Sequence, residues 1–259
     1  NQLSLTARGT MTYSKNTILE ADDQFSNYPY TTLSGFRVNQ NKGLIALGLF
    51  KDYEDIRNSA TQNFGRTAPG DIKYKDINGD GKIDDTDIVP IGATRYPNLV
   101  YGFGLSANYK SFDASVHFQG AGKSSFFING YTVYPFSQGD WGNILTDVVE
   151  SNRWILGVNE DVNAQYPRLS YGGSANNYRA STYWLRESSY LRLKTLDIGY
   201  AIPNGFTKRI GVKSARLYAM GTNLLTFSKF KLWDPEMNSS NGQAYPLAKT
   251  ITLGLTINL

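Results

Sequence analysis

The stretch from Leu99 to Gln119, LVYGFGLSANYKSFDASVHFQ, decides how the rest of the chain is interpreted. From Leu99 to Tyr109 every second residue is apolar or aromatic, and the residues between are mostly small or polar. After Lys110-Ser111 the same alternation returns from Phe112 onward. A period of two over about ten residues predicts a half-buried antiparallel strand, so the stretch predicts a hairpin. A two-residue turn pairs Tyr109 with Phe112 and puts both apolar rows on one face.

This hairpin has two interpretations. In a soluble β-sandwich the apolar face packs against a second sheet. In a membrane barrel the same face contacts lipid, and a strand needs about 9–11 residues to cross the bilayer. The alternation alone does not distinguish the two.

Other segments repeat the pattern. Leu3–Tyr13, Lys213–Leu225 and Lys249–Leu259 alternate in the same way, and Tyr190–Ile202 does so with a phase shift that indicates a bulge. Gly43–Phe50 also reads as a strand, with a short one possible at 36–38, and short helices are expected within 51–60 and 146–154.

The lengths of the connections favour the barrel. The turns at 110–111 and 203–212 are short, whereas the connections at 51–96, 120–189 and 226–248 are long. Counted along the strands, the short turns fall at one end of the sheet and the long loops at the other. Outer-membrane barrels segregate their connections in this way. The expected fold class is therefore an all-β, antiparallel transmembrane β-barrel segment with long extracellular loops.

Composition narrows the functional classes. The 259 residues include no Cys and one His, and the net charge of +4 comes from scattered Lys and Arg. We therefore expect no thiolate metal site and no nucleic-acid partner. A transmembrane helix is excluded because no run of 18 apolar residues exists. His117 has no evident nucleophile partner, and no catalytic motif occurs, so we expect no enzyme and no catalytic residues.

An acidic loop matches the calcium-loop template D-x-[DN]-x-[DN]-G. Oxygens at alternate positions converge on one cation, Gly81 permits the sharp turn, and an acidic residue at position 12 completes the ligands. The predicted ligands are Asp76, Asn78, Asp80, Lys82 through its carbonyl, Asp84 and Asp87. We expect a structural calcium ion. The alternative is an Asx-rich turn whose side chains bind its own backbone.

Several motifs together resemble the SusC/RagA-like TonB-dependent transporters of the Bacteroidota outer membrane. They are Pro69–Asp84 with Val89–Gly92, Tyr96–Phe112 with Phe118–Gly120, Trp184–Lys194 with Leu196–Pro203, Gly221–Leu225, Asp234–Glu236, and Tyr245–Leu259. The resemblance implies that residues 1–259 are the C-terminal portion of the barrel, the last seven or eight of roughly 22 strands. It places 68–88 and 120–189 in extracellular loops and the C-terminus on the periplasmic side, with the plug domain absent from this chain.

The resemblance also implies a function. Such transporters import glycans or oligosaccharides, less often peptides, and the chain's partners would be the remaining barrel and plug, a SusD-like surface lipoprotein, TonB and outer-membrane lipid. Aromatic residues of the long loop would stack on substrate, and the candidates are Tyr134, Trp141, Trp154 and Trp184. Two alternatives stay open: a small closed outer-membrane barrel used for adhesion, and a soluble calcium-dependent carbohydrate-binding β domain.

Overall fold

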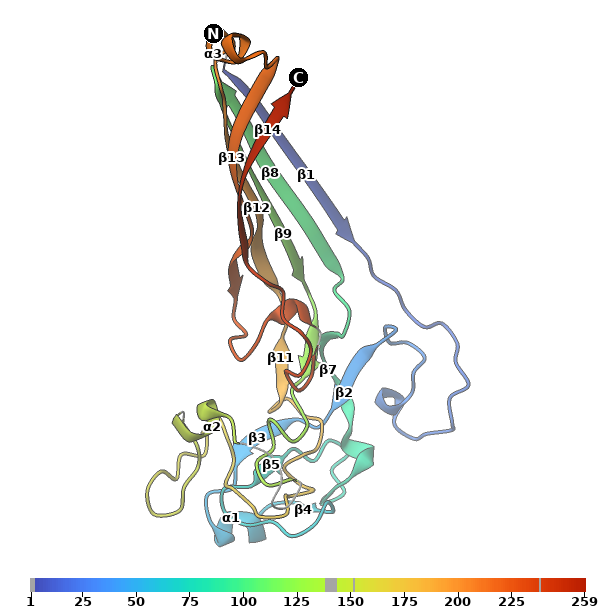
Figure 1. The fold of residues 1–259 in the computed structure, drawn as a ribbon. Helices are drawn as coiled ribbons and strands as arrows, with labels where there is room; N and C mark the ends of the chain where they lie inside the picture. Colours follow the sequence, from blue (N-terminus) through green and yellow to red (C-terminus); the bar gives the residue numbers. More distant parts are fainter. Residues whose placement is uncertain (1–2, 138–143, 151, 238) are drawn as a thin grey trace.

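A long antiparallel sheet of six strands forms one end of the molecule (Figure 1). The structure is a computed structural model that describes residues 3–137, 144–150, 152–237 and 239–259. The strands of the sheet, in spatial order, are β1 (Ser4–Tyr13), β8 (Leu99–Tyr109), β9 (Phe112–Gly122), β12 (Tyr190–Ala201), β13 (Ser214–Ser228) and β14 (Thr250–Asn258).

The expected count of seven or eight sheet strands is corrected to six in the described chain. The segment expected to be a strand at 43–50 instead divides between two short strands of other sheets. These are β2 (Gln40–Gly43), which pairs with β7 (Val89–Thr94), and β3 (Ala46–Leu49), which pairs with β5 (Ile72–Tyr74). Four residues cover only about 13 Å, too little to cross a bilayer, and neighbouring Leu44 and Phe50 are buried.

The hairpin has the register expected from the sequence. Tyr109 lies opposite Phe112, and Leu105 lies opposite Val116. Lys110 in the turn adopts φ 55°, the left-handed conformation that two-residue hairpin turns require. The predicted bulge is also confirmed, because the register of β12 shifts between Leu193 and Thr195 against both of its neighbours. The bulge returns Leu196, Ile198 and the following alternate residues to the apolar face.

The two faces of this sheet differ in chemistry. One, the apolar face, carries aliphatic and aromatic side chains on all six strands, and no second sheet of the described chain covers it. Leu5 is 71% exposed and Leu253 is 79% exposed. The other, the polar face, carries Arg8, His117, Asp113 and Asp197 among small residues. A layered sandwich would bury the apolar face, so the soluble-sandwich arrangement is not what this chain forms.

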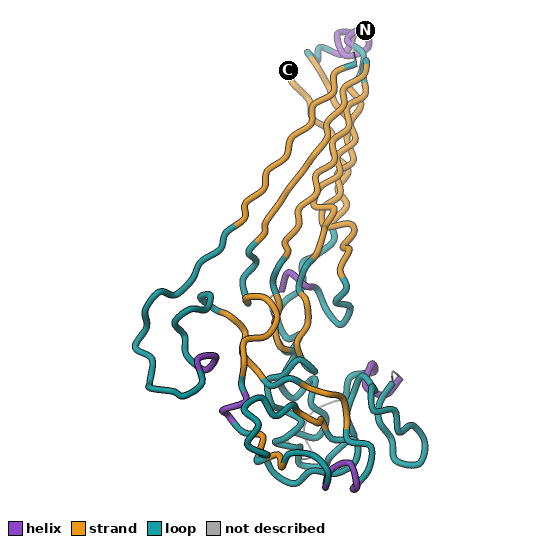
Figure 2. The backbone as a smooth tube through the Cα atoms, turned by 180° about the vertical axis from the view of Figure 1, so that it is seen from behind, coloured by secondary structure: helices purple, strands orange, loops and turns teal. Residues whose placement is uncertain are grey.

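Short and long connections lie at opposite ends of the sheet, as expected (Figures 1 and 2). The hairpin turn, both chain ends and the short helices α3 (Asn204–Thr207) and η3 (Lys208–Ile210) lie at one end. The described residues of 14–98, 123–189 and 229–249 gather at the other end, and we call these segments the loop region. None of the helices in the described chain is long and apolar enough to cross a membrane.

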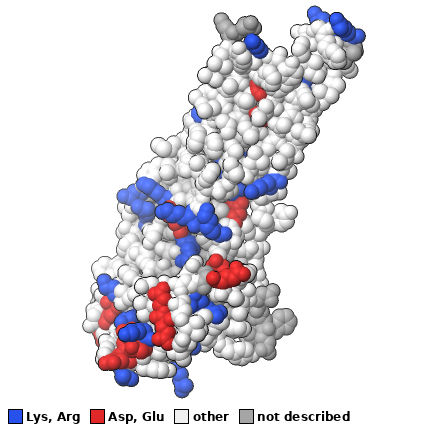
Figure 3. All heavy atoms as spheres, turned by 90° about the vertical axis from the view of Figure 1, so that its left-hand side faces the viewer, with Lys and Arg blue, Asp and Glu red and all other residues white. Residues whose placement is uncertain are grey.

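The loop region contains the buried core. Its small elements are η1 (Pro29–Thr31), α1 (Tyr53–Arg57), β4 (Thr61–Gln62) paired with β6 (Lys82–Ile83), η2 (Asp85–Asp87), β10 (Ser125–Phe127) paired with β11 (Leu185–Glu187), α2 (Thr146–Glu150) and η4 (Pro235–Met237). Leu44, Ile72, Val148 and Trp184 belong to one buried cluster there. On the face seen in Figure 3, most charged side chains lie over the loop region or at the far tip, with a largely uncharged stretch of sheet between them.

Candidate functional site

The acidic loop is folded by its own side chains. The carboxylate of Asp76 accepts the backbone N–H groups of Gly79 and Gly81 at 2.7 and 2.9 Å. Asp80 accepts Lys82 N–H, and Asp84 caps η2 by accepting Thr86 N–H. Gly81 adopts φ 79°, so the turn expected at this glycine is present. Hydrogen bonds from Thr86 hold the pKa of Asp84 below its ordinary value.

Asp87 closes this loop from the inside. It is fully buried and accepts Ile77 N–H at 2.8 Å and Asp84 N–H at 2.9 Å. Asn78 donates to Thr86 and accepts Asp80 N–H. Within the residues described, no group of three or more Asp, Glu, His or Cys side chains is arranged to hold a metal ion. This geometry is that of an Asx-rich loop.

The aromatic residues expected to stack on substrate lie in the core. Trp184 is 1% exposed, and its indole N–H donates to Asn177 carbonyl oxygen at 2.6 Å. Tyr134 is 8% exposed, stacks on Tyr178 and meets Trp184 edge-on, and burial raises the pKa of its hydroxyl. Rings this enclosed offer no face to a sugar, so the structure gives Tyr134 and Trp184 a packing role. Trp141 lies outside the described residues.

Trp154 also is nearly enclosed, at 4% exposed, but it lines a cavity of about 430 Å³ on the loop region. Tyr53 and Pro69 form one wall, and Leu156 and Leu169 line it together with Arg153 and Arg168. The Trp154 ring packs against the backbone of Gly70, where an added β-carbon would lie 2.3 Å from the ring. Gly70 also adopts φ 84°, a conformation that favours glycine. Small-molecule sites have this volume and this apolar character. Periodicity gave no signal for the cavity because its lining comes from four separate stretches of the chain, at 53, 68–69, 153–156 and 168–169.

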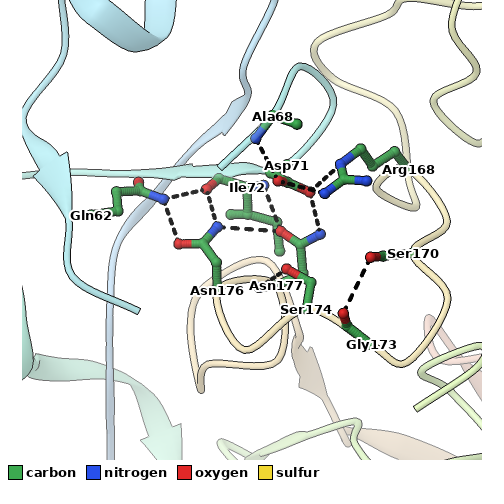
Figure 4. A network of polar contacts seen from close by, with 10 residues as sticks. All are labelled: Gln62, Ala68, Asp71, Ile72, Arg168, Ser170, Gly173, Ser174, Asn176 and Asn177. Carbon is green, nitrogen blue, oxygen red and sulfur yellow. Dashed lines mark hydrogen bonds and ion pairs between the residues drawn. The ribbon is translucent and has the colours of Figure 1, made fainter. Parts of the chain in front are cut away.

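A buried polar network fixes one side of this cavity (Figure 4). Arg168 forms an ion pair of 2.7 Å with Asp71, which is fully buried. Asp71 also accepts Asn177 Nδ2 at 2.8 Å, and the side chain of Asn177 accepts Ile72 N–H. Asn176 extends the network to Gln62. Because every residue of the network has a partner, the network holds the segments 62–72 and 168–177 rigidly together.

The polar face of the sheet carries a second paired cluster. The guanidinium of Arg216 on β13 binds Asp113 on β9 and Asp197 on β12. It reaches Asp113 by lying over Gly199, where a β-carbon would collide with three of its atoms. One cation thus ties three neighbouring strands on the face opposite the apolar one.

Comparison with known proteins identifies the chain's relatives. No family model matches it. TonB-dependent receptor P26 of Formosa agariphila is 32% identical over 228 residues, 83% of this chain. The chain is a homologue of TonB-dependent receptors. Receptor P3 of the same organism is 31% identical over 74% of the chain, and SusC of Bacteroides thetaiotaomicron is 28% identical over 73%. The chain spans about a fifth of the length of these curated relatives.

Solved structures show the same fold. The RagAB peptide importer in its open-open state matches with a TM-score of 0.71 at 20% identity, over 99% of this chain and 27% of that one. A second RagAB structure matches with a TM-score of 0.70 at 23% identity, over 98% and 27%. The six-stranded sheet therefore has the same fold as part of the RagAB structures, and it is open between β1 and β14. The relatives are receptors and transporters rather than enzymes.

Proposed function

We propose that this chain forms part of the wall of an outer-membrane nutrient importer of the SusC/RagA type. The observation that carries the proposal is the continuous apolar face across six paired strands, exposed on one side while the opposite face is polar. In a bilayer that face meets lipid, and burial in hydrocarbon compensates for its exposure. Homology to TonB-dependent receptors supports the same assignment.

Open sheet edges are not tolerated in lipid, so β1 and β14 must each pair with further strands. We assign these strands to the rest of the transporter, with its plug in the lumen and TonB as the source of energy. A SusD-like lipoprotein would cover the loop region, which then faces the cell exterior. In this orientation residues 68–88 and 120–189 are extracellular and the C-terminus is periplasmic.

The substrate in this proposal is a glycan or oligosaccharide rather than a peptide. The closeness of two Formosa agariphila receptors and of SusC in sequence supports placing the chain with them, whereas its likeness to the RagAB peptide importer is one of fold. The alternative of a small closed barrel is contradicted by the open order of the sheet, β1-β8-β9-β12-β13-β14.

A calcium ion in the acidic loop is a further part of the proposal. The template spacing and the φ of Gly81 support it. The ion would be held by Asp76, Asn78, Asp80, the carbonyl of Lys82, Asp84 and Asp87, and it would hold the loop in shape.

Charged substitutions on the apolar face test the membrane assignment. Phe103→Arg and Val116→Arg each put a guanidinium where we expect lipid, at a cost of about 2–4 kcal/mol near the bilayer centre. We expect both variants of the full transporter to assemble poorly in outer membranes. Thr252→Arg on the polar face is the control and should assemble normally. If the Phe103 and Val116 variants assemble as well as this control, the apolar face does not contact lipid.

A further inference from the structure

A hollow on the polar face of the sheet, about 240 Å³ in volume, is lined by hydrogen-bond donors. Arg8 on β1, Ser106 on β8, Ser115 and His117 on β9 and Thr195 on β12 surround it. Arg8, Gly104, His117 and Thr195 form one continuous row across four strands, because each is the register partner of the next.

Gly104 makes the hollow possible. It lies between Arg8 and His117, whose strands are second neighbours and therefore about 10 Å apart. A β-carbon at Gly104 would lie 3.1 Å from Nδ1 of His117 and 2.9 Å from the carbonyl oxygen of Val116. Without that side chain, the space between guanidinium and imidazole stays open and is about large enough for one oxyanion and its water.

The donors around the hollow have no acceptor. Among the residues that the structure describes, the side chains of Arg8, Ser106, Ser115, His117 and Thr195 form no hydrogen bond and no ion pair. No carboxylate of the described residues lines the hollow. The nearest one along the register is Asp197, opposite Ser115, and it is already bound by Arg216.

The contrast with the neighbouring cluster indicates what is missing. Arg216 is paired with two carboxylates. Arg8 instead lines the hollow together with hydroxyl groups and an imidazole, and none of these described side chains carries a negative charge. Guanidinium and hydroxyl groups that converge on one space favour an acceptor with several oxygens. We propose that this hollow is an oxyanion site that binds a carboxylate, sulfate or phosphate group.

Two sources could supply that group: a solute in the lumen, or an acidic side chain of another segment of the transporter that projects into the lumen. The oxyanion site depends on the proposed function in one respect: it assumes that the polar face of the sheet faces the lumen of the barrel. Its tests measure anion binding rather than uptake. They can therefore fail while the transport assignment stands, and they can succeed while the transport assignment fails.

The first test uses the full transporter in detergent, with inorganic sulfate as the probe and the imidazole NMR signal of His117 as the readout, assigned by its loss in His117→Gln. We expect the signal to shift and saturate with sulfate. Arg8→Gln should raise the half-saturating concentration at least tenfold and Ser106→Ala two- to fivefold. Lys110→Gln makes the same charge change in the exposed turn between β8 and β9, away from the hollow. It should alter the half-saturating sulfate concentration less than twofold.

The second test identifies the source by determining the structure of the full transporter without added sulfate. A carboxylate of another segment within hydrogen-bond distance of Arg8 and His117 assigns the group to the protein, and sulfate should then bind only after that residue is replaced by its amide. An empty or water-filled hollow together with saturable sulfate binding assigns it to a solute. A hollow without any carboxylate, combined with a sulfate response that does not saturate or does not depend on Arg8, overturns the proposal.

Discussion

The guanidinium of Arg192 on β12 lies 2.5 Å from Oδ1 of Asp234, in the long connection between β13 and β14. Arg192 is 2% exposed, and its Nε lies 3.0 Å from Glu236. The same connection also contacts another segment of the loop region, where Asn129 N–H donates to the carbonyl of Ser240. One buried cation, Arg192, therefore ties this part of the loop region to the polar face of the sheet.

Loss of that cation should release the connection. Arg192→Met removes the cation that pairs with Asp234 and leaves Glu236 with Lys194 alone, at 3.7 Å. Breaking a buried ion pair costs up to about 3–5 kcal/mol. We expect a lower unfolding free energy by denaturant titration and faster protease cleavage within 229–249. Lys229→Met is the matched control, because Lys229 is 87% exposed and its pair with Glu187 contributes at most about 1 kcal/mol. Equal effects of the two substitutions would contradict the anchoring role of Arg192.

Gly199 should be intolerant of even a methyl group. Gly199→Ala puts a β-carbon into the guanidinium of Arg216 and separates it from Asp113. We expect the free energy of unfolding to fall by about 1–3 kcal/mol. When samples are preheated in steps and then run on a gel, the variant barrel should therefore unfold at a lower temperature than the parent barrel. Gly205→Ala in α3 should leave the transition unchanged, because the added β-carbon would come within 4 Å of no described atom outside its own helical turn. A normal transition in Gly199→Ala would show that Arg216 has room to move aside.

Alkaline pH should destabilise the loop region. Burial raises the pKa of the Tyr74 hydroxyl well above 10, and the hydroxyl donates to Asn176 carbonyl oxygen at 2.8 Å. A folded pKa above the unfolded value of about 10 gives stability that is complete below pH 10 and is lost as pH rises above it.

Absorbance at 295 nm should show the buried tyrosines ionising together with unfolding. Tyr74→Phe should weaken the loss of stability above pH 10, and Tyr245→Phe should not. A Tyr74 hydroxyl that ionises in the folded protein near pH 10 would contradict the burial argument.

Removal of one ligand should test the calcium hypothesis. Asp80→Ala takes away the carboxylate at position 5 of the acidic loop, so bound calcium measured on the purified transporter should fall by one equivalent. Asp22→Ala, outside the loop, should not change the calcium content. Unchanged calcium in Asp80→Ala would leave the loop as a set of Asx turns held by the hydrogen bonds already seen to Lys82 and Gly81.

The sequence by itself determined the sheet. Alternation with period two is a local property, because successive side chains point to opposite faces whatever the chain does elsewhere. The hairpin register at Tyr109 and Phe112, the bulge in β12 and the segregation of short and long connections follow from it.

Tertiary structure alone decided the loop region. Trp184 and Tyr134 resemble surface aromatics in sequence, yet contacts with Asn177 and Tyr178 place them in the core. The cavity beside Trp154 and the hollow between Arg8 and His117 combine residues far apart along the chain. Such sites depend on which distant segments meet, and a periodic pattern contains no information about that, because it repeats only between near neighbours.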